Sequence, residues 1–318
     1  METRKLILAL LIIAIFPTLY GQTESQRKYL VADYEGIKAF IQSSQSTASL
    51  STHFHSDDTY YDLYLDSPDF LLLKNRMSLR FRKRVPGNKK KKPTYAFQLK
   101  SEMDSLNSVR MEVEETELDF YMLKSGDQWI AMSVLLDSVF KYIEESPDEP
   151  INPKTSAAFA LIQDWVEFKA GGAIAPFQKL LFLGFSLEEV QSLRPTASGK
   201  TQRMRSHIYS NAEQTALLDL AQNRIKENKL PKFFKKKGEY NWLLESSLDR
   251  AVFIPLYTSK VPVARISEYE VENKYYQAET GEKISSIYAG ELSGIYQLST
   301  KLDSKYRQAI QAFGEHPK

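Results

Sequence analysis

Arginine and glutamate alternate with apolar residues along several stretches, and this period of two residues predicts β-strands. Residues 77–84 place Arg80, Arg82 and Arg84 on one side of the chain, opposite Leu79 and Phe81. Two further stretches alternate in the same way, with polar positions at Arg110, Glu112, Glu114, Glu268, Glu270, Glu272 and Lys274. Guanidinium groups bind phosphate oxygens in pairs, and clustered carboxylates bind hard cations such as Mg²⁺ or Mn²⁺. Gathered inside one barrel, these residues would hold a polyphosphate together with a metal.

The start of the chain shows the same alternation, with Glu24, Gln26 and Lys28 on one side. A half-buried strand normally turns its mixed polar face to water. One alternative is therefore that all these faces are solvated, and a second is a lipocalin-like carrier barrel with its charges outside. Because several strands share the pattern, we favour a polar interior.

The elements that must position these residues change in type along the chain. Period-two patterns prevail from Gln26 to Glu117, with a short helix predicted over residues 31–42. From about residue 120 to 195 the spacing is helical and predicts helices over Trp129–Glu144 and Ser156–Phe168. This segment is interpreted as an insertion.

The second half returns to strands and closes with a helix. The predicted strands are 201–209, 215–221, 245–254 and 267–276. Ser186–Glu189 resembles a capping box that opens a short helix before them, and Leu292–Phe313 reads as an amphipathic helix after them. Strands, helices, strands and a final helix together predict the α+β class.

A series of short motifs also runs through the chain in a fixed order. The first half contains Glu24-Ser-Gln-Arg-Lys28, Tyr64-Leu-Asp-Ser-Pro68, Leu79-Arg-Phe-Arg82, Ala96-Phe-Gln-Leu-Lys100 and Arg110-Met-Glu-Val-Glu114. The second half contains Arg203 and Arg205, Ser247-Leu-Asp-Arg250, Glu268-Tyr-Glu-Val-Glu272 and Ser304-Lys-Tyr306. In this order, over about residues 24–306, the motifs resemble the CYTH superfamily, the triphosphate tunnel metalloenzymes.

The resemblance implies an eight-stranded antiparallel β-barrel, a tunnel that binds triphosphate compounds with Mg²⁺ or Mn²⁺. Members hydrolyse inorganic triphosphate, thiamine triphosphate or nucleoside triphosphates, cyclise ATP, or make polyphosphate. The phosphate-binding residues that it implies are Lys28, Arg80, Arg82, Lys100, Arg110, Arg203 and Arg205. The metal ligands that it implies are Glu24, Glu112, Glu114, Asp249, Glu270 and Glu272. The catalytic residues that it implies are Glu24, Gln26, Glu112 and Glu114, and Asp249 either holds metal or orients a basic residue.

Gln26 departs from the family pattern, which has a second glutamate at this position of its first strand. An amide oxygen still binds a cation but brings no negative charge. Metal binding is therefore expected to be weaker, and a catalytic group is lost. The main hypothesis is an exported protein that binds and hydrolyses polyphosphate or scavenged organic phosphates. The runner-up is a tunnel that binds them without turnover.

The first residues read as a secretory signal peptide. Arg4 and Lys5 precede an apolar run from Leu6 to Phe16, about half the length of a membrane span, and Pro17 ends it. We expect cleavage before Gln22, which leaves residues 22–318 as one domain in the periplasm or secreted. The alternative is an uncleaved anchor.

The overall composition excludes some classes of ligand and of metal site. The chain has 318 residues, with 42 Lys+Arg and 40 Asp+Glu, and this near-neutral balance argues against a nucleic-acid binder. The sequence has no cysteine, which excludes disulfides and thiolate metal sites and fits a metal site built from oxygen ligands. The sequence leaves the oligomeric state open.

Overall fold

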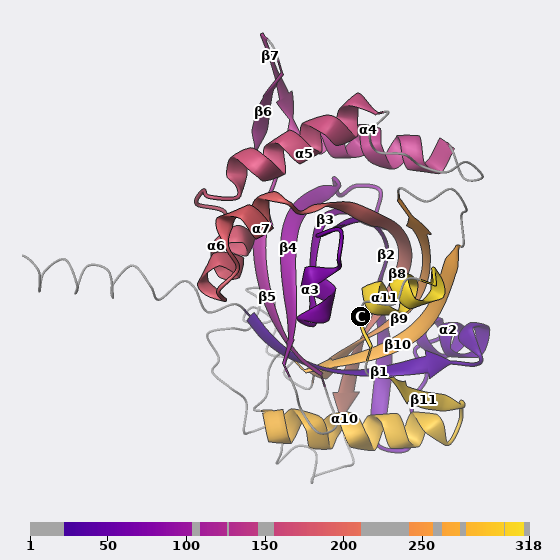
Figure 1. Cartoon of the computed structure of the whole chain (residues 1–318). Coiled ribbons are helices and arrows are strands. Elements are labelled where there is room, and N and C mark those ends of the chain that lie inside the picture. Colours follow the sequence, from indigo (N-terminus) through magenta and orange to yellow (C-terminus); the bar gives the residue numbers. More distant parts are fainter. Residues whose placement is uncertain are drawn as a thin grey trace, which may run out of the picture.

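A computed structural model shows a large antiparallel β-sheet with helices packed on it (Figure 1). It describes residues 22–103, 109–125, 127–145, 156–210, 242–256, 263–273, 278–301 and 303–314. The predicted signal peptide and the predicted strand 215–221 lie outside these residues. Among the described residues, no helix combines the length and the apolar character that a membrane crossing needs.

The α+β class and the large antiparallel sheet are confirmed by the order of the elements. The strands are β1 (Gln22–Val31), β2 (Leu50–Asp66), β3 (Met77–Val85), β4 (Thr94–Met103), β5 (Val109–Glu117), β6 (Met122–Ser125), β7 (Gln128–Ala131), β8 (Arg194–Ser210), β9 (Trp242–Pro255), β10 (Ala264–Asn273) and β11 (Leu298–Lys301). The helices are α2 (Tyr34–Gln42), α3 (Leu71–Lys74), α4 (Met132–Glu145), α5 (Ala157–Lys169), α6 (Ala175–Phe182), α7 (Leu187–Gln191), α10 (Ala278–Ser293) and α11 (Lys305–Ala312).

The main sheet has the strand order β10-β9-β8-β2-β3-β4-β5-β1-β11. In addition, β1 pairs with β10, the strand at the other end of this order, over Ser25–Leu30. The first half of β1 pairs with β5, so β1 joins strands from both halves of the chain. The main sheet thus has nine strands where an eight-stranded barrel was expected, and the additional short strand, β11, was not predicted from the sequence.

Alternation along the strands gives the sheet one apolar and one polar face. Leu79 and Phe81 of β3 and their neighbours Phe97 and Leu99 of β4 are buried in an apolar core. Helices α4 to α7 add their own apolar residues to this core, with Trp165 at its centre. The helical segment therefore covers the outer face of these strands (Figure 1). Because successive side chains of a strand alternate, Arg80 and Arg82 lie on the opposite face.

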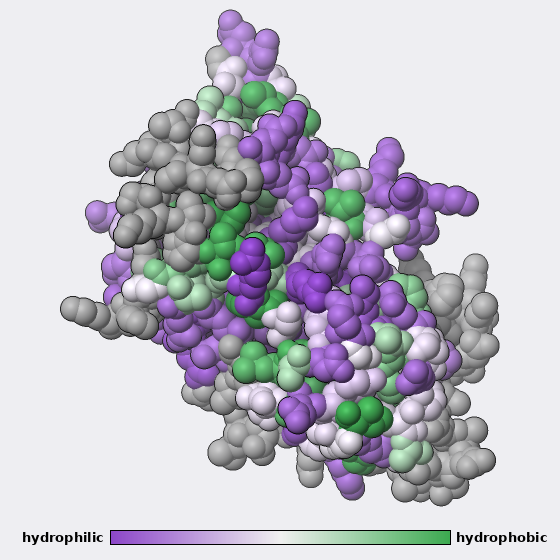
Figure 2. Space-filling view, turned by 90° about the vertical axis from the view of Figure 1, so that its right-hand side faces the viewer, coloured by the Kyte–Doolittle hydropathy of each residue, from purple (hydrophilic) through white to green (hydrophobic). Residues whose placement is uncertain are grey.

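A second apolar core lies under α2 and α10. Ile37 and Phe40 of α2 and Ile284 and Tyr288 of α10 pack with residues of β8, β9 and β10. Both cores lie on the apolar side of strands, so the fold is stabilised by outward-facing residues. Figure 2 shows the face that is on the right in Figure 1, where hydrophilic residues predominate and hydrophobic ones form small separate groups.

Two predicted helices differ from the observed elements. Residues 292–313 were expected to form one helix, but the segment contains the end of α10, strand β11 and α11. Leu298–Lys301 pairs with β1, so tertiary pairing overrides the helical periodicity there. Trp129 was placed in a helix but belongs to the β6–β7 hairpin, and the helix begins only at Met132.

The capping box is confirmed at the start of α7. The hydroxyl of Ser186 accepts from the backbone of Glu189, and the Glu189 carboxylate accepts from the backbone of Ser186. The motif around Asp66 has a comparable local role, because its carboxylate accepts from the backbone N–H groups of Ser67, Leu72 and Leu73. Asp66 thus fixes the turn from β2 into α3.

Candidate functional site

The polar faces of the strands enclose a small cavity of about 50 Å³. An adjoining cavity of about 270 Å³ shares Arg82, Lys100 and Arg203 with it. Six of the residues that line the smaller cavity are cationic: Lys28, Arg80, Arg82, Lys100, Arg203 and Lys305. Only two of its lining residues, Asp62 and Glu270, are acidic. Five of the seven predicted phosphate-binding residues therefore meet here, and Arg205 lines the adjoining cavity.

Two of these arginines are oriented by residues of the two strands that pair with β3. Arg82 donates from Nε and Nη2 to the two carboxylate oxygens of Asp62, at 2.7 and 2.8 Å. Arg80 donates to the amide oxygen of Gln98 at 3.1 and 3.0 Å and to the hydroxyl of Tyr64 at 3.1 Å. Burial raises the pKa of Asp62, but the charges of Arg80 and Arg82 outweigh it and hold that pKa below its usual range. Asp62 therefore remains a carboxylate that fixes the two guanidinium groups.

A third arginine is fixed from the second half of the chain. Arg203 donates to both oxygens of Asp249, at 2.8 and 2.5 Å, and to Glu270 at 3.0 Å. Of the two roles left open for Asp249, the structure shows the orientation of a basic residue.

The ring of Tyr60 forms a shared support for three arginines. The guanidinium carbons of Arg82, Arg203 and Arg205 lie 4.6, 5.6 and 5.6 Å from the ring centre, and Arg205 also donates to the Tyr60 hydroxyl. Cation–π attraction offsets part of the repulsion among the three charges. Tyr60 itself is buried on β2, between β3, which carries Arg82, and β8, which carries Arg203 and Arg205, so one ring contacts arginines from both neighbouring strands.

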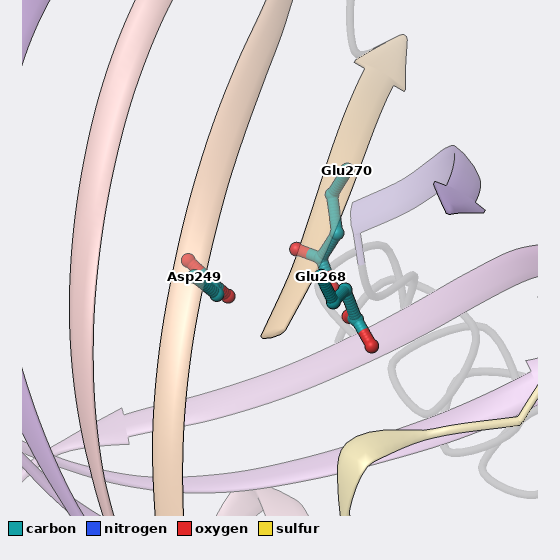
Figure 3. Close-up of side chains that lie close together, drawn as sticks. All are labelled: Asp249, Glu268 and Glu270. Carbon is teal, nitrogen blue, oxygen red and sulfur yellow. The ribbon is translucent and has the colours of Figure 1, made fainter. Parts of the chain in front are cut away.

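A cluster of three acidic residues lies beside Arg203. One carboxylate oxygen from each of Asp249, Glu268 and Glu270 lies within 4.8 Å of the others (Figure 3). The residues come from adjacent strands, since Glu268 of β10 pairs with Asp249 of β9. The Nζ atom of Lys305 lies 2.7 Å from Asp249, 2.6 Å from Glu268 and 2.8 Å from Glu270. The cluster therefore already contains a cation that belongs to the chain.

The remaining predicted site residues lie in several places. Gln26 lines the smaller cavity and donates from its amide to Glu272 at 3.3 Å, and Glu272 lines the larger cavity. On β5, Glu115 pairs with Gln98 and accepts from its amide, whereas Glu114 pairs with the core residue Leu99. Glu114 therefore belongs to the strand face opposite Arg80 and Arg82. The side chains of Glu24, Arg110 and Glu112 lie outside the described part of the structure.

Sequence reasoning missed four residues that shape the site. Tyr60, Asp62 and Tyr64 alternate along β2, and this period-two pattern had been used only to predict a strand. The pairing of Asp62 with Arg82 of β3 would have identified it, but this pairing depends on the register of the two strands, which the sequence does not show. Lys305 had been noticed only as part of a motif in the last helix.

Three of the four histidines lie close together, two near the start of β2 and one near the end of β8. His53 pairs with His207, and the rings of His55 and His207 stack with their centres 4.2 Å apart. Burial, reinforced by His55 and Arg205, lowers the pKa of His207 from 6.5 to about 4. Between these values His207 is neutral in the folded chain and protonated in the unfolded chain, so stability decreases as pH falls through this window.

We expect the substitution His207→Gln to flatten this pH dependence. The free energy of unfolding of the wild type should fall between pH 7 and pH 4 by on the order of 1–2 kcal/mol more than that of the variant, a figure reduced for partial exposure. Urea unfolding at both pH values measures the difference. His53→Gln, which changes an exposed imidazole on the paired strand, is the control and should behave as the wild type. Equal slopes for wild type and His207→Gln would contradict the expectation.

Comparison with known proteins places this geometry in context. The family model of the CYTH domain matches residues 22–287. Among solved structures, HpAC1 of Hippeastrum, described as an adenylyl cyclase candidate with dominant triphosphatase activity, is 12% identical, with 92% of this chain and 97% of that chain covered and a TM-score of 0.42.

Two further solved structures show a similar degree of likeness. An adenylate cyclase candidate from Bacillus halodurans is 16% identical, with 92% and 98% of the chains covered and a TM-score of 0.40. PH1819 of Pyrococcus horikoshii is 10% identical, with 91% and 98% covered and a TM-score of 0.42. No curated protein sequence matches the chain.

Proposed function

The chain belongs to the CYTH family, and from this premise we propose that it binds and hydrolyses a triphosphate or polyphosphate inside a tunnel formed by its strands. The observation that carries the proposal is the convergence of six cationic residues on one small buried cavity. A phosphate chain carries a negative charge at each phosphate, and fixed guanidinium groups stabilise both the bound chain and the charge that develops during its cleavage. The pairing of β1 with both β5 and β10 supports a closed tunnel around this cavity.

The burial of the charged residues does not support a lipocalin-like carrier barrel with its charges outside. Arg80 is 8% exposed and Glu270 is 4% exposed, and both line the cavity. Burial of so many charged groups costs free energy unless each has a partner, and here they pair with one another. A bound anion is the ligand that such an interior fits.

Mg²⁺ or Mn²⁺ is the proposed cofactor, and when bound it would neutralise phosphate charge and polarise the phosphorus–oxygen bonds. The acidic cluster fits such an ion poorly, because Lys305 and Arg203 already bind its carboxylates. Among the other predicted ligands, Glu272 lines the larger cavity, and it would hold the ion there.

A non-catalytic binding protein is the second candidate, and Gln26 is the observation that favours it. Its amide donates a hydrogen bond to Glu272, so the position contributes a donor where the family pattern has a carboxylate. A protein of this kind would bind a phosphate chain through the same arginines without cleaving it.

One pair of measurements on residues 22–318 separates the two candidates. Calorimetric binding of tripolyphosphate together with phosphate release in Mg²⁺ or Mn²⁺ supports a hydrolase, whereas binding without release supports the second candidate. Absence of both would contradict the proposed function.

We expect Gln26→Glu to raise phosphate release several-fold, because it adds a carboxylate beside Glu272. The control Gln202→Glu adds a carboxylate at an exposed position of β8 that lines neither cavity, and it should not raise release. An unchanged rate in Gln26→Glu would contradict a catalytic role for position 26.

We also propose that the mature protein is periplasmic or secreted, as a single domain over residues 22–318 with a helical insertion at about 120–195. The basic and apolar leader of the sequence supports this. N-terminal sequencing of the protein recovered from cell fractions tests it, and the expected first residue is Gln22. A first residue upstream of Leu6 would contradict cleavage.

A further inference from the structure

The acidic cluster in the cavity wall has the composition of a metal site. Asp249 and Glu268 are fully buried and Glu270 is 4% exposed, and their oxygens approach within 4.8 Å. Three carboxylates held this close in a buried place repel one another strongly unless a cation lies among them or one of them takes up a proton. The identity of that cation decides what chemistry this wall of the cavity supports.

In this chain a lysine side chain supplies the cation. The ammonium of Lys305 lies 2.6–2.8 Å from one oxygen of each of the three carboxylates, and its side chain is 12% exposed. The ammonium donates a hydrogen bond to Glu270, and its contacts with Asp249 and Glu268 are ion pairs. Opposite-charge attraction, acting against the cost of burial, raises the pKa of Lys305 above its ordinary value, so the group stays charged.

The other carboxylate oxygens are also engaged. Arg203 donates to both oxygens of Asp249 and to the second oxygen of Glu270. Gln308 donates to the second oxygen of Glu268 at 3.1 Å. Every oxygen of the cluster therefore faces a cation or a donor of the chain itself, and a divalent ion would have to displace one of them.

The helix that carries Lys305 is fixed at several points. Ser304 caps its first turn by accepting from the backbone of Arg307, and the guanidinium of Arg307 donates to the carbonyl of Leu73 at 2.7 Å. The hydroxyls of Tyr306 and Thr196 lie 2.8 Å apart. The contacts of α11 with the rest of the fold therefore hold the backbone of Lys305 in the position from which its side chain reaches the three carboxylates.

We propose that Lys305 is a built-in cation that takes the place of a metal ion among Asp249, Glu268 and Glu270 and closes this cluster to divalent metals. The wall of the cavity then has a positive charge among its carboxylates in the absence of metal, and Arg203 stays bound to Asp249 and Glu270. This inference concerns the same cavity as the proposed function. Its test measures metal binding without substrate, so a lack of hydrolysis would leave it standing.

The test is a titration of residues 22–318 with Mn²⁺, in which the electron paramagnetic resonance signal of the free ion is measured at each step. We expect Lys305→Met to bind one Mn²⁺ more than the wild type, because removal of the ammonium leaves three buried carboxylates. The overall affinity of the variant for Mn²⁺ should be roughly tenfold higher than that of the wild type, or more. Lys305→Arg retains the charge and should gain no site. The double variant Lys305→Met/Asp249→Asn should lose the gained site.

Equal Mn²⁺ binding by the wild type and Lys305→Met would overturn the proposal, as would loss of a wild-type Mn²⁺ site in Asp249→Asn. Thermal unfolding of both proteins with and without Mn²⁺ covers the case in which Lys305→Met folds poorly. Mn²⁺ should then restore a cooperative transition to the variant and leave the wild-type midpoint unchanged. A variant that remains unfolded in Mn²⁺ would count against the proposal.

Discussion

Replacement of Arg80 and Arg82 together by alanine is expected to weaken tripolyphosphate binding by roughly 100-fold or more, because charge-assisted hydrogen bonds contribute about 1.5–3 kcal/mol each. Both guanidinium groups line the small cavity and are held in place by Asp62, Gln98 and Tyr64. Their removal also leaves the buried Asp62 without these partners, and its charge would repel a phosphate. Isothermal titration with tripolyphosphate measures the loss.

Arg84→Ala is the matched control for this prediction. Arg84 follows on the same strand and also binds a carboxylate, that of Asp58 at 2.8 Å, but it lines neither of the two polar cavities that contain Arg82. Its replacement should change binding by no more than a few-fold. Adding Asp62→Asn to the double variant removes the buried charge that has lost its partners, so this triple variant should fold if the double variant does not. Far-UV circular dichroism of each variant checks that it is folded. A double variant that binds like the wild type would show that phosphate does not bind in this cavity.

The largest expected effect on stability comes from Trp165→Ala. This side chain is fully buried between the helical segment and the sheet, with ring centres 5.3 Å from Phe81, 5.5 Å from Phe97 and 5.9 Å from Phe177. Truncation of a buried tryptophan leaves a large void, and we expect the free energy of unfolding to fall by about 3–5 kcal/mol. Urea unfolding followed by far-UV circular dichroism measures the change without reliance on tryptophan fluorescence.

Two further variants separate packing from other effects. Trp165→Phe should cost much less than Trp165→Ala, because the indole N–H has no hydrogen-bond partner among the described residues and the aromatic volume is largely kept. Trp129→Ala removes a tryptophan that is 64% exposed in the β6–β7 hairpin and should leave stability nearly unchanged. A loss below about 1 kcal/mol in Trp165→Ala would mean that the helical segment contributes little to the folded sheet.

Strand patterns predicted much of the polar site, because a strand turns every second residue to the same face. Arg80, Arg82, Lys100 and Arg203 were expected to converge, and they line one cavity. The same reasoning failed where partners depend on register. Asp62 fixes two arginines only because β2 and β3 pair with Asp62 opposite Arg82, and a one-residue slip would reverse this face.

The end of the chain was the hardest part to predict from the sequence. The periodicity of residues 292–313 is compatible with a helix, and only pairing with β1 selects a strand at Leu298–Lys301. The role of Lys305 depends in turn on the docking of α11 against β10, which no local pattern reveals. Long-range contacts therefore decide the features that local propensity leaves open.

The double pairing of β1 also constrains how the chain acquires its structure. Gln26 and its hydrogen-bond partner Glu272 are 246 positions apart, so one edge of the first strand has no partner until nearly the whole polypeptide has been synthesised. Strand contacts at such separations close slowly, because the entropy of a long loop is lost before the pairing is formed. Folding of this sheet is therefore expected to follow synthesis, because the β1–β10 pairing that joins the two halves of the chain forms only after residue 273 has been added.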